Sequence, residues 1–324
     1  MHEKVLQKML SPGGPIPPKY QEILVQFVTC YSQALGEHFD AAIPNLLLFF
    51  ELVIPNFSKP YSFQPYHQKI RHPIDYYRFG LDFIGPLIEE ETSRIYGEEH
   101  LEEIQKALHA GENAILLGNH QTEPDPQVIS ILLEKKYKEL AEKIIFVAGE
   151  RVITDPLAIP FSMGCDLLCI YSKRYIDHPP ELKEQKRLHN KQTMEKMSRL
   201  LSEGGKIIYV APSGGRDRKN ISGKIEVAPF DPDSIEMFRL MAKKGGKKTL
   251  FIPFALSTYD LLPPPKVIQK ELGEIRVTKK TSVSISFAPP FPMENNEGVD
   301  RKEIREKRAK EIWKIVNTMF EANS

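Results

Sequence analysis

Short apolar segments alternate with longer amphipathic ones from about residue 86 onward, and this alternation most limits the folds open to the chain. Each apolar segment is short enough for a strand buried on both faces. The segments between them have helical spacing, as in 190–205, where Gly204 and Gly205 supply a C-terminal stop. This pattern predicts a layered α/β domain with a largely parallel mixed sheet. The six expected strands are 114–118, 143–149, 166–171, 206–212, 250–256 and 282–287.

Residues 1–85 differ from the rest, because their helical spacing is interrupted by prolines. The run "LLLFFELVI" at 46–54 is apolar on nearly every side, so we expect it inside a small bundle. It includes Glu51 and has about half the length that a bilayer requires, which predicts a soluble protein. The N-terminus matches neither a signal peptide nor a transit peptide. We therefore expect two domains, a helical bundle over 1–85 and an α/β domain over 86–324.

The charge and cysteine content exclude several classes of function. The net charge is +1, so any basic site for an anion has to be local, and nucleic-acid binding is not expected. No glycine-rich phosphate loop and no dinucleotide fingerprint occurs. Cys30, Cys165 and Cys169 lack zinc or disulfide spacing, which indicates buried thiols in a reducing compartment. We expect neither a metal nor a cofactor.

The segment "GNHQTEPDP" follows the first expected strand and leads into a helix, and two interpretations of it are open. In the first, Pro126 is the first helical residue, Asp125 is the N-cap and His120 is an ordinary loop histidine. In the second, the turn folds the Asp125 carboxylate back onto His120. That contact would fix the tautomer and leave the other ring nitrogen free to take a proton from an alcohol. The carboxyl end of a strand, where ligands bind in parallel α/β sheets, favours the second interpretation.

Three further loops after expected strands carry charged residues. Two glycines before Arg216 let the backbone approach a ligand, and guanidinium groups suit phosphate, which predicts a local anion pocket. Solvated charges, a glycine turn facing water and an internal ion pair are the alternatives. Ser213 is not expected to be a hydrolase nucleophile, because a nucleophile elbow needs glycine at position 211, which is alanine. The charged residues are Lys173 and Arg174 in "YSKRYI", Arg216 and Arg218 in "APSGGRDRKN", and Glu150 and Arg151 in "VAGERVITDP".

Together, "GNHQTEPDP", "VAGERVITDPLAIPFSMG", "YSKRY", "APSGGRDR" and "APFDPDSIEMFRLM" before "LFIPFAL" resemble the glycerolipid acyltransferases that share an N-H-x-x-x-x-D motif. They are most similar to the soluble glycerol-3-phosphate acyltransferases of the plastid and chlamydial type. The resemblance covers about residues 85–290. It implies transfer of a fatty acyl group from a thioester to the sn-1 hydroxyl of glycerol 3-phosphate, giving 1-acylglycerol 3-phosphate. No metal or cofactor is implied.

The resemblance also implies roles for individual residues. His120 becomes the general base and Asp125 the residue that orients it. The wider superfamily has a glutamate in its third motif, which this chain replaces with "SGGR". The residues implied to bind the substrate phosphate are Lys173, Arg174, Arg216 and Arg218, with Glu150, Arg151 and Ser213 as secondary candidates.

Two other functions stay open: acyl transfer to 1-acylglycerol 3-phosphate, and non-catalytic binding of a phosphorylated metabolite. The resemblance favours acyl carrier protein over coenzyme A as the carrier of the acyl group. A basic docking face for that acidic carrier is expected at 186–192 or 243–248, and an apolar groove for the acyl chain near Pro253 and 261–266. The expected location is the bacterial cytoplasm or the plastid stroma, with at most peripheral membrane contact for product release.

Overall fold

The computed structural model describes residues 11, 13–172, 176–265, 272–293 and 300–323. Within these ranges, eight strands form a sheet in the order β1-β5-β4-β6-β3-β9-β10-β2, and β7 pairs with β8 in a separate hairpin. The strands from β5 to β9 in that order run parallel, whereas β1 and β10 are antiparallel to their neighbours β5 and β9. The bounds are β1 (Tyr66–His67), β2 (Arg94–Tyr96), β3 (Asn113–Gly118), β4 (Ile144–Gly149), β5 (Asp166–Ile170), β6 (Ile207–Val210), β7 (Arg218–Lys219), β8 (Ile225–Glu226), β9 (Thr249–Ser257) and β10 (Ser284–Phe287). All six predicted strands are present, and the largely parallel mixed sheet is confirmed.

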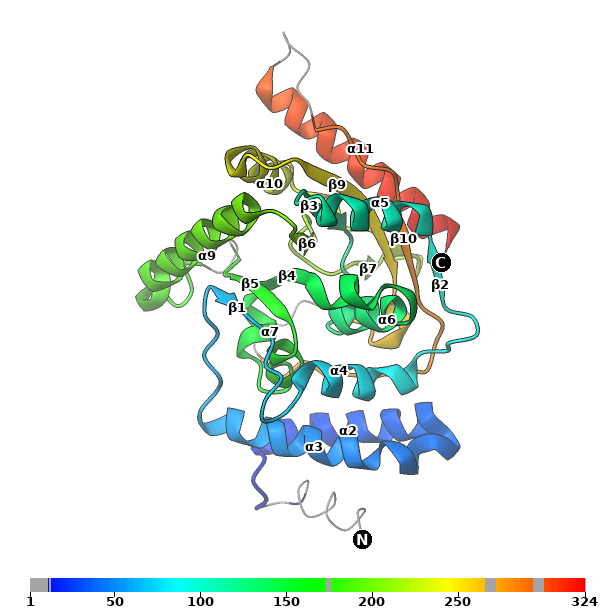
Figure 1. Ribbon diagram of the computed structural model, residues 1–324. Helices are drawn as coiled ribbons and strands as arrows, with labels where there is room; N and C mark the ends of the chain where they lie inside the picture. The colour runs from blue at the N-terminus through cyan, green and yellow to red at the C-terminus, as the bar shows by residue number, and fades with distance from the viewer. Residues whose placement is uncertain (1–10, 12, 173–175, 266–271, 294–299, 324) are drawn as a thin grey trace.

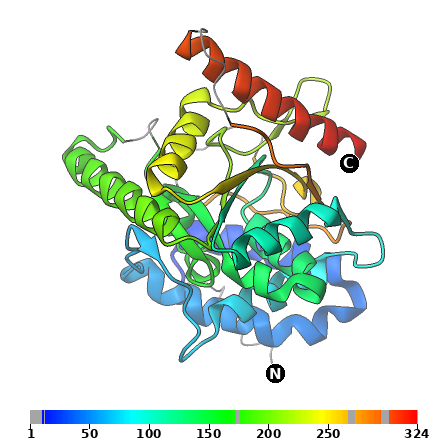
Figure 2. The ribbon, with the colours of Figure 1, turned by 45° about the horizontal axis from the view of Figure 1, so that its top comes forward.

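Helices cover both faces of the sheet, because its central strands are apolar on both sides. The helix bounds are α2 (Pro18–Leu35), α3 (Phe39–Ser58), α4 (Tyr76–Ile84), α5 (Glu98–His109), α6 (Asp125–Lys143), α7 (Glu150–Thr154), α8 (Ile159–Met163), α9 (Lys183–Glu203), α10 (Pro232–Gly245) and α11 (Arg301–Ala322). On β3, Leu116 joins the core under α5 and α6, whereas Ile115 and Leu117 join the core under α9, α10 and α11. Figure 2 shows those three helices, in green, yellow and red, over one face of the sheet.

Helices α2 and α3 form an outer layer beyond α4 (Figure 1). The apolar run predicted to lie inside a bundle belongs to α3, where Leu46, Phe50 and Val53 are fully buried. By length and composition alone, the described stretch 18–58 could cross a membrane. However, a 3-10 turn at Gly36–His38 interrupts it, and the buried side chains of α3 pack against the rest of the fold. The soluble state therefore stays a prediction.

Residues on both sides of position 85 share one hydrophobic core. The ring centroid of Phe83 in α4 lies 5.1 Å from that of Tyr31 and 5.2 Å from those of Phe49 and Phe161. Phe161 belongs to α8, and Val128 of α6 joins the same core. Strand β1 also precedes residue 85, although it pairs with β5 of the main sheet. The division into 1–85 and 86–324 stays a prediction, and the two parts have a core in common.

Replacing Phe83 with alanine tests how far this shared core stabilises the whole chain. Phe83 is 1% exposed, so Phe83→Ala is expected to lower the free energy of unfolding by about 3–5 kcal/mol through lost burial and a residual cavity. Urea unfolding followed by circular dichroism should keep a single transition. Val25→Ala, at an exposed position of α2, should change stability by less than about 0.5 kcal/mol. Two separate transitions, or a loss below about 1 kcal/mol for Phe83→Ala, would contradict the shared core.

Candidate active site

A cavity of about 1420 Å³ lies at the carboxyl ends of β3, β4 and β6. Part of its lining is apolar and comes from α2, α3, α4 and the segment leading into α8, and another part comes from α9 and α10. The apolar part includes Ile23, Leu24, Phe27, Phe49, Phe83, Ile84, Leu157 and Phe161. The structure brings six of the residues predicted from sequence to this cavity, namely His120, Asp125, Glu150, Arg151, Ser213 and Arg216. Loops that follow separate strands therefore meet at one site.

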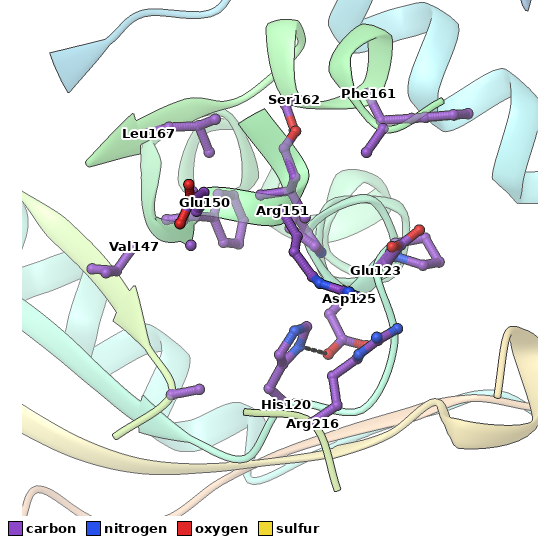
Figure 3. A pocket seen from close by; sticks show the side chains of 18 of the residues that line it. His120, Glu123, Asp125, Val147, Glu150, Arg151, Phe161, Ser162, Leu167 and Arg216 are labelled. Atoms are coloured by element: carbon purple, nitrogen blue, oxygen red, sulfur yellow. Dashed lines mark hydrogen bonds and ion pairs between the residues drawn. The ribbon is translucent and has the colours of Figure 1, made fainter. Parts of the chain in front are cut away.

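His120 and Asp125 form a hydrogen-bonded pair in this cavity (Figure 3). The Nδ1 atom of His120 lies 2.7 Å from Oδ2 of Asp125. Asp125 is fully buried and also accepts from the backbone amides of Gln121 and Thr122 and from the hydroxyls of Thr122 and Thr258. Burial raises the pKa of Asp125, but the hydrogen bond and charge of His120 and the other donors outweigh it, so the pKa lies below its usual range. An ionised carboxylate only accepts, so Nδ1 of His120 carries a proton, and Nε2 is the acceptor when the ring is neutral.

This geometry decides between the two interpretations of the "GNHQTEPDP" loop. Helix α6 begins at Asp125, and its N-cap residue Pro124 makes no side-chain cap hydrogen bond. The Asp125 carboxylate turns back to the loop at 120–122 instead of forward to the first helical turn. The N-cap interpretation of Asp125 is therefore wrong, and the folded-back arrangement is the one observed.

The residues on either side of His120 tie its loop to the end of β9. Asn119 forms two hydrogen bonds with the backbone of Leu256, donating at 3.0 Å and accepting at 2.7 Å. Gln121 accepts from the Thr258 amide at 2.6 Å. Asn119 and Gln121 are fully buried, whereas the His120 side chain between them is 28% exposed. The loop thus places His120 at the cavity on a rigid support.

Arg151 and Arg216 direct their guanidinium groups into the space beside the His120–Asp125 pair (Figure 3). Both bind the same carboxylate, with Arg151 Nη1 2.5 Å and Arg216 Nη2 2.8 Å from Oε2 of Glu274. The side chain of Glu274 is 3% exposed and that of Arg216 is 11% exposed. A glycine turn with its charge in water is therefore wrong as a description of Arg216.

The other predicted phosphate-binding residues are placed differently. Arg218 does not line the cavity, and its Nη1 donates to the carbonyl oxygen of Pro265. Burial, together with the neighbouring charge of Arg216, lowers the pKa of Arg218. Within the described ranges no carboxylate forms a salt bridge with Arg218. Lys173 and Arg174 lie outside the described residues.

The secondary candidates Glu150 and Ser213 make local contacts. Glu150 Oε1 lies 2.9 Å from Nζ of the buried Lys186, so Glu150 takes part in an internal ion pair, which was the alternative to a functional role, with a partner that was not foreseen. The Ser213 hydroxyl donates to the carbonyl oxygen of Gly215 at 2.9 Å, within its own glycine turn. Both side chains line the cavity but are engaged by other protein groups.

A second charge cluster at the site was missed by the sequence reasoning. Arg276 Nε lies 2.8 Å from Glu123 and its Nη2 lies 3.0 Å from Asp155. Glu274 and Arg276 come from a segment that forms neither helix nor strand. Both charged residues are buried while Ile275 between them is 47% exposed, the reverse of the usual pattern, so the pattern of hydrophobicity along the chain provided no signal for them.

Of the three cysteines, Cys165 lines the cavity, whereas Cys30 and Cys169 do not. All three are free thiols, and Cys165 and Cys169 are buried, as predicted, whereas Cys30 is half-buried. Burial raises the pKa of the Cys165 and Cys169 thiols to about 12, which keeps them protonated and unreactive. In the part of the chain that the structure describes, no group of three or more His, Cys, Asp or Glu side chains could hold a metal. The absence of a metal or cofactor stays a prediction.

The chain is similar in sequence to known acyltransferases. Residues 93–257, just over half of the chain, match the Acyltransferase family. The chain is 38% identical to the chloroplastic glycerol-3-phosphate acyltransferase ATS11 of Cucurbita moschata, over 87% of this chain and 64% of that protein. It is 38% identical to the chloroplastic glycerol-3-phosphate acyltransferase of Arabidopsis thaliana, over 87% and 62%. It therefore spans less than two thirds of the length of either relative.

Two further relatives differ in how closely they match. The chain is 35% identical to the chloroplastic glycerol-3-phosphate acyltransferase ATS12 of Cucurbita moschata, over 97% of this chain and 70% of that protein. A solved structure, the 1-acyl-sn-glycerophosphate acyltransferase PlsC of Thermotoga maritima, covers 93% of this chain and 98% of its own at 16% identity and a TM-score of 0.40. That likeness is too distant to bear on the site. The chain belongs to the Acyltransferase family and, within it, to the plastid-type glycerol-3-phosphate acyltransferases.

Proposed function

We propose that the chain transfers a fatty acyl group from a thioester to the sn-1 hydroxyl of glycerol 3-phosphate, giving 1-acylglycerol 3-phosphate. The observation that carries this proposal is the His120–Asp125 pair. Asp125 holds Nδ1 of His120, so Nε2 is available in a cavity that also contains two guanidinium groups. A base beside an anion site suits an alcohol that bears a phosphate group. The names of the chloroplastic relatives support the same acceptor.

In the proposed reaction, Nε2 of His120 removes the proton from the sn-1 hydroxyl while the oxygen of that hydroxyl attacks the thioester carbonyl carbon. The C–S bond breaks as the carbonyl re-forms, and the departing thiolate takes the proton from the imidazolium. Asp125 stabilises the imidazolium and keeps the ring oriented between the two steps. A general base in this position contributes about 10²–10⁴-fold to the rate. No covalent acyl-enzyme is required.

The acceptor phosphate is proposed to bind beside Arg216, whose guanidinium lines the cavity next to His120. Arg218 adds positive charge that no described carboxylate neutralises, and the family resemblance adds Lys173 and Arg174. Anchoring the phosphate orients the far hydroxyl toward Nε2 of His120. Positioning of this kind acts mainly on the binding of the polar substrate.

The acyl chain is proposed to lie along the apolar part of the cavity, between the outer helical layer and the segment leading into α8. Leu261 and Leu262, from the segment expected to border an acyl groove, line this cavity. Pro253 does not, because it lies inside β9 and pairs with Leu117 of β3. The acyl groove is therefore proposed without the part attributed to Pro253.

The two basic segments expected to dock an acyl carrier lie at different edges of the sheet. Residues 186–192 belong to the first turns of α9, and Asn190 lines the cavity. Residues 243–248 precede the first residue of β9, at the amino end of the parallel strands and opposite His120. The position of residues 186–192 beside the cavity supports the proposal that acyl carrier protein, or coenzyme A, docks there. The chloroplastic relatives support the plastid stroma over the bacterial cytoplasm as the location.

Removing the imidazole of His120 tests the proposed function directly. Acyl transfer to radiolabelled glycerol 3-phosphate is measured for the wild type and His120→Ala, with acyl carrier protein and coenzyme A thioesters offered in parallel. The kcat of His120→Ala should fall by about 10²–10⁴-fold, because the hydroxyl then loses its base. Calorimetric binding of glycerol 3-phosphate should persist. His109→Ala, at an exposed position of α5, serves as the matched control with full activity.

The outcomes of this assay separate the alternatives. Near-normal turnover of His120→Ala would refute the role of His120 as general base. Faster transfer to 1-acylglycerol 3-phosphate than to glycerol 3-phosphate would show that the former is the acceptor. Binding of glycerol 3-phosphate without transfer from either donor would make the chain a non-catalytic binding protein.

Truncating Arg216 tests the phosphate site. Arg216→Ala should raise the apparent KM for glycerol 3-phosphate by about 10- to 100-fold, the value of one charge-assisted hydrogen bond, and change kcat less. Arg199→Ala, an exposed arginine of α9, is the control and should leave both constants unchanged. An unchanged KM for Arg216→Ala would remove Arg216 from the phosphate site.

Neutralising Glu274 tests whether it is the counter-ion of the two cavity arginines. Glu274→Gln should lower the free energy of unfolding by about 3 kcal/mol, because the largely buried guanidinium of Arg216 and the partly exposed one of Arg151 lose their carboxylate. Inorganic phosphate should then raise the Tm of the variant more than that of the wild type, since it can take the place of the missing charge. Glu226→Gln on the exposed hairpin is the control. Equal phosphate effects on wild type and Glu274→Gln would contradict this role.

A further inference from the structure

Asp217 stands between the two predicted phosphate-binding arginines, but its side chain contacts the His120 loop. It is fully buried. Its Oδ2 accepts from Nδ2 of Asn119 at 2.7 Å and from Nε2 of Gln121 at 3.2 Å, and its own backbone amide donates to the carbonyl oxygen of His120 at 2.7 Å. Its other oxygen accepts from the Ala228 amide at 2.9 Å. One residue of the arginine loop therefore holds His120 and both of its chain neighbours.

The partners of the Asp217 carboxylate are all donors, and the two amide side chains are fixed in that orientation. The oxygen of Asn119 already accepts from the Leu256 amide at 2.7 Å. The oxygen of Gln121 already accepts from the Thr258 amide at 2.6 Å. Neither amide can turn round without breaking these bonds. Only a group that accepts at every position, an ionised carboxylate, satisfies the site.

We propose that Asp217 is a positioning residue that couples the arginine loop to His120. Glycerol 3-phosphate whose phosphate is held by Arg216 then presents its sn-1 hydroxyl at a fixed distance from Nε2 of His120. This inference rests on the proposed function. Asp217 touches neither substrate in that scheme, and it acts by joining two loops that follow different strands, β3 and β6. A displacement of about 1 Å between bound substrate and base is enough to cost about 100-fold in rate.

The energetics of the site agree with a positioning role. Burial raises the pKa of Asp217 to about 6, although its hydrogen bonds and the nearby His120 oppose the rise. The pKa of Asp217 is higher in the folded state than in the unfolded state. The native state therefore loses stability as the pH rises from the ordinary pKa of an aspartate to about 6, where Asp217 ionises. The fold thus holds a buried carboxylate that does not stabilise it at neutral pH. Other ionisable groups nearby are Arg216 and Arg218 on its own segment and Tyr209 of β6.

Asp217→Asn tests the coupling, because an amide fails in either orientation. Its NH₂ group would face either the Asn119 and Gln121 donors or the Ala228 amide. The kcat for acyl transfer should fall by about 100-fold, while the KM and the calorimetric Kd for glycerol 3-phosphate change by less than about threefold. Glu236→Gln is the control for loss of stability alone, because this buried carboxylate of α10 pairs with Arg239 and Arg308 and does not line the cavity.

The pH profile of kcat/KM supplies a readout that a merely structural role would not move. As the pH falls through about 6, Asp217 gains a proton, so kcat/KM of the wild type should show a loss of activity that Asp217→Asn lacks. Glu236→Gln should keep the wild-type profile. An identical profile in the wild type and Asp217→Asn would overturn the proposal, and so would a wild-type profile without a loss of activity near pH 6, even if Asp217→Asn failed to fold. Equal loss of kcat in Asp217→Asn and Glu236→Gln would also overturn it.

A spectroscopic measurement separates this inference from the proposed function. The Nδ1 proton of His120, bonded to Asp125, is followed by nuclear magnetic resonance in the wild type and Asp217→Asn. A shifted resonance in the variant supports positioning even if the wild type transfers no acyl group, in which case only the proposed function fails. An unchanged resonance together with unchanged kcat would refute the positioning role.

Discussion

The buried carboxylate of Asp125 is the interaction on which the rest of the site depends. An ionised group with no exposure is costly unless every lone pair is satisfied, and Asp125 accepts from His120, Gln121, Thr122 and Thr258. These donors come from the loop after β3 and from the end of β9. The carboxylate therefore fixes the tautomer of His120 and also fastens two neighbouring strands at the edge where the cavity lies. A histidine in a free loop would have neither constraint.

The sheet was predictable from the sequence because its central strands are buried on both faces, which makes each one a continuous apolar run. Edge strands lack that signal. Strands β1 and β2 have two and three residues, and neither was predicted. The core shared across residue 85 was equally invisible, because the contact between Phe83 and Phe161 depends on how layers stack and not on local periodicity. Sequence periodicity identifies which faces are apolar, whereas the partner of each face is set by the tertiary fold.

The candidate site likewise contains residues that were predictable from the sequence and residues that were not. His120, Asp125 and Arg216 could be predicted, because the carboxyl ends of parallel strands bring their loops together. Glu274 and Arg276 could not, since they lie far along the chain in a segment without regular structure, 123 positions from Arg151 and 153 positions from Glu123, with which they pair. The role of Asp217 was hidden for another reason. It sits between two arginines, and only the three-dimensional structure shows that its side chain points to the His120 loop.

In this chain two arginines of the expected anion pocket, Arg151 and Arg216, already share a carboxylate, that of Glu274. Arginines without a partner would pay the full cost of desolvation before any substrate arrives, whereas a shared carboxylate holds both guanidinium groups in place. A phosphate with two negative charges can still compete for donors that one carboxylate divides between two cations. In the proposed reaction the product carries the same phosphate as the substrate. Under this proposal, a built-in competitor limits how tightly either is held, so Glu274 would favour release of the product while it holds the two arginines in place.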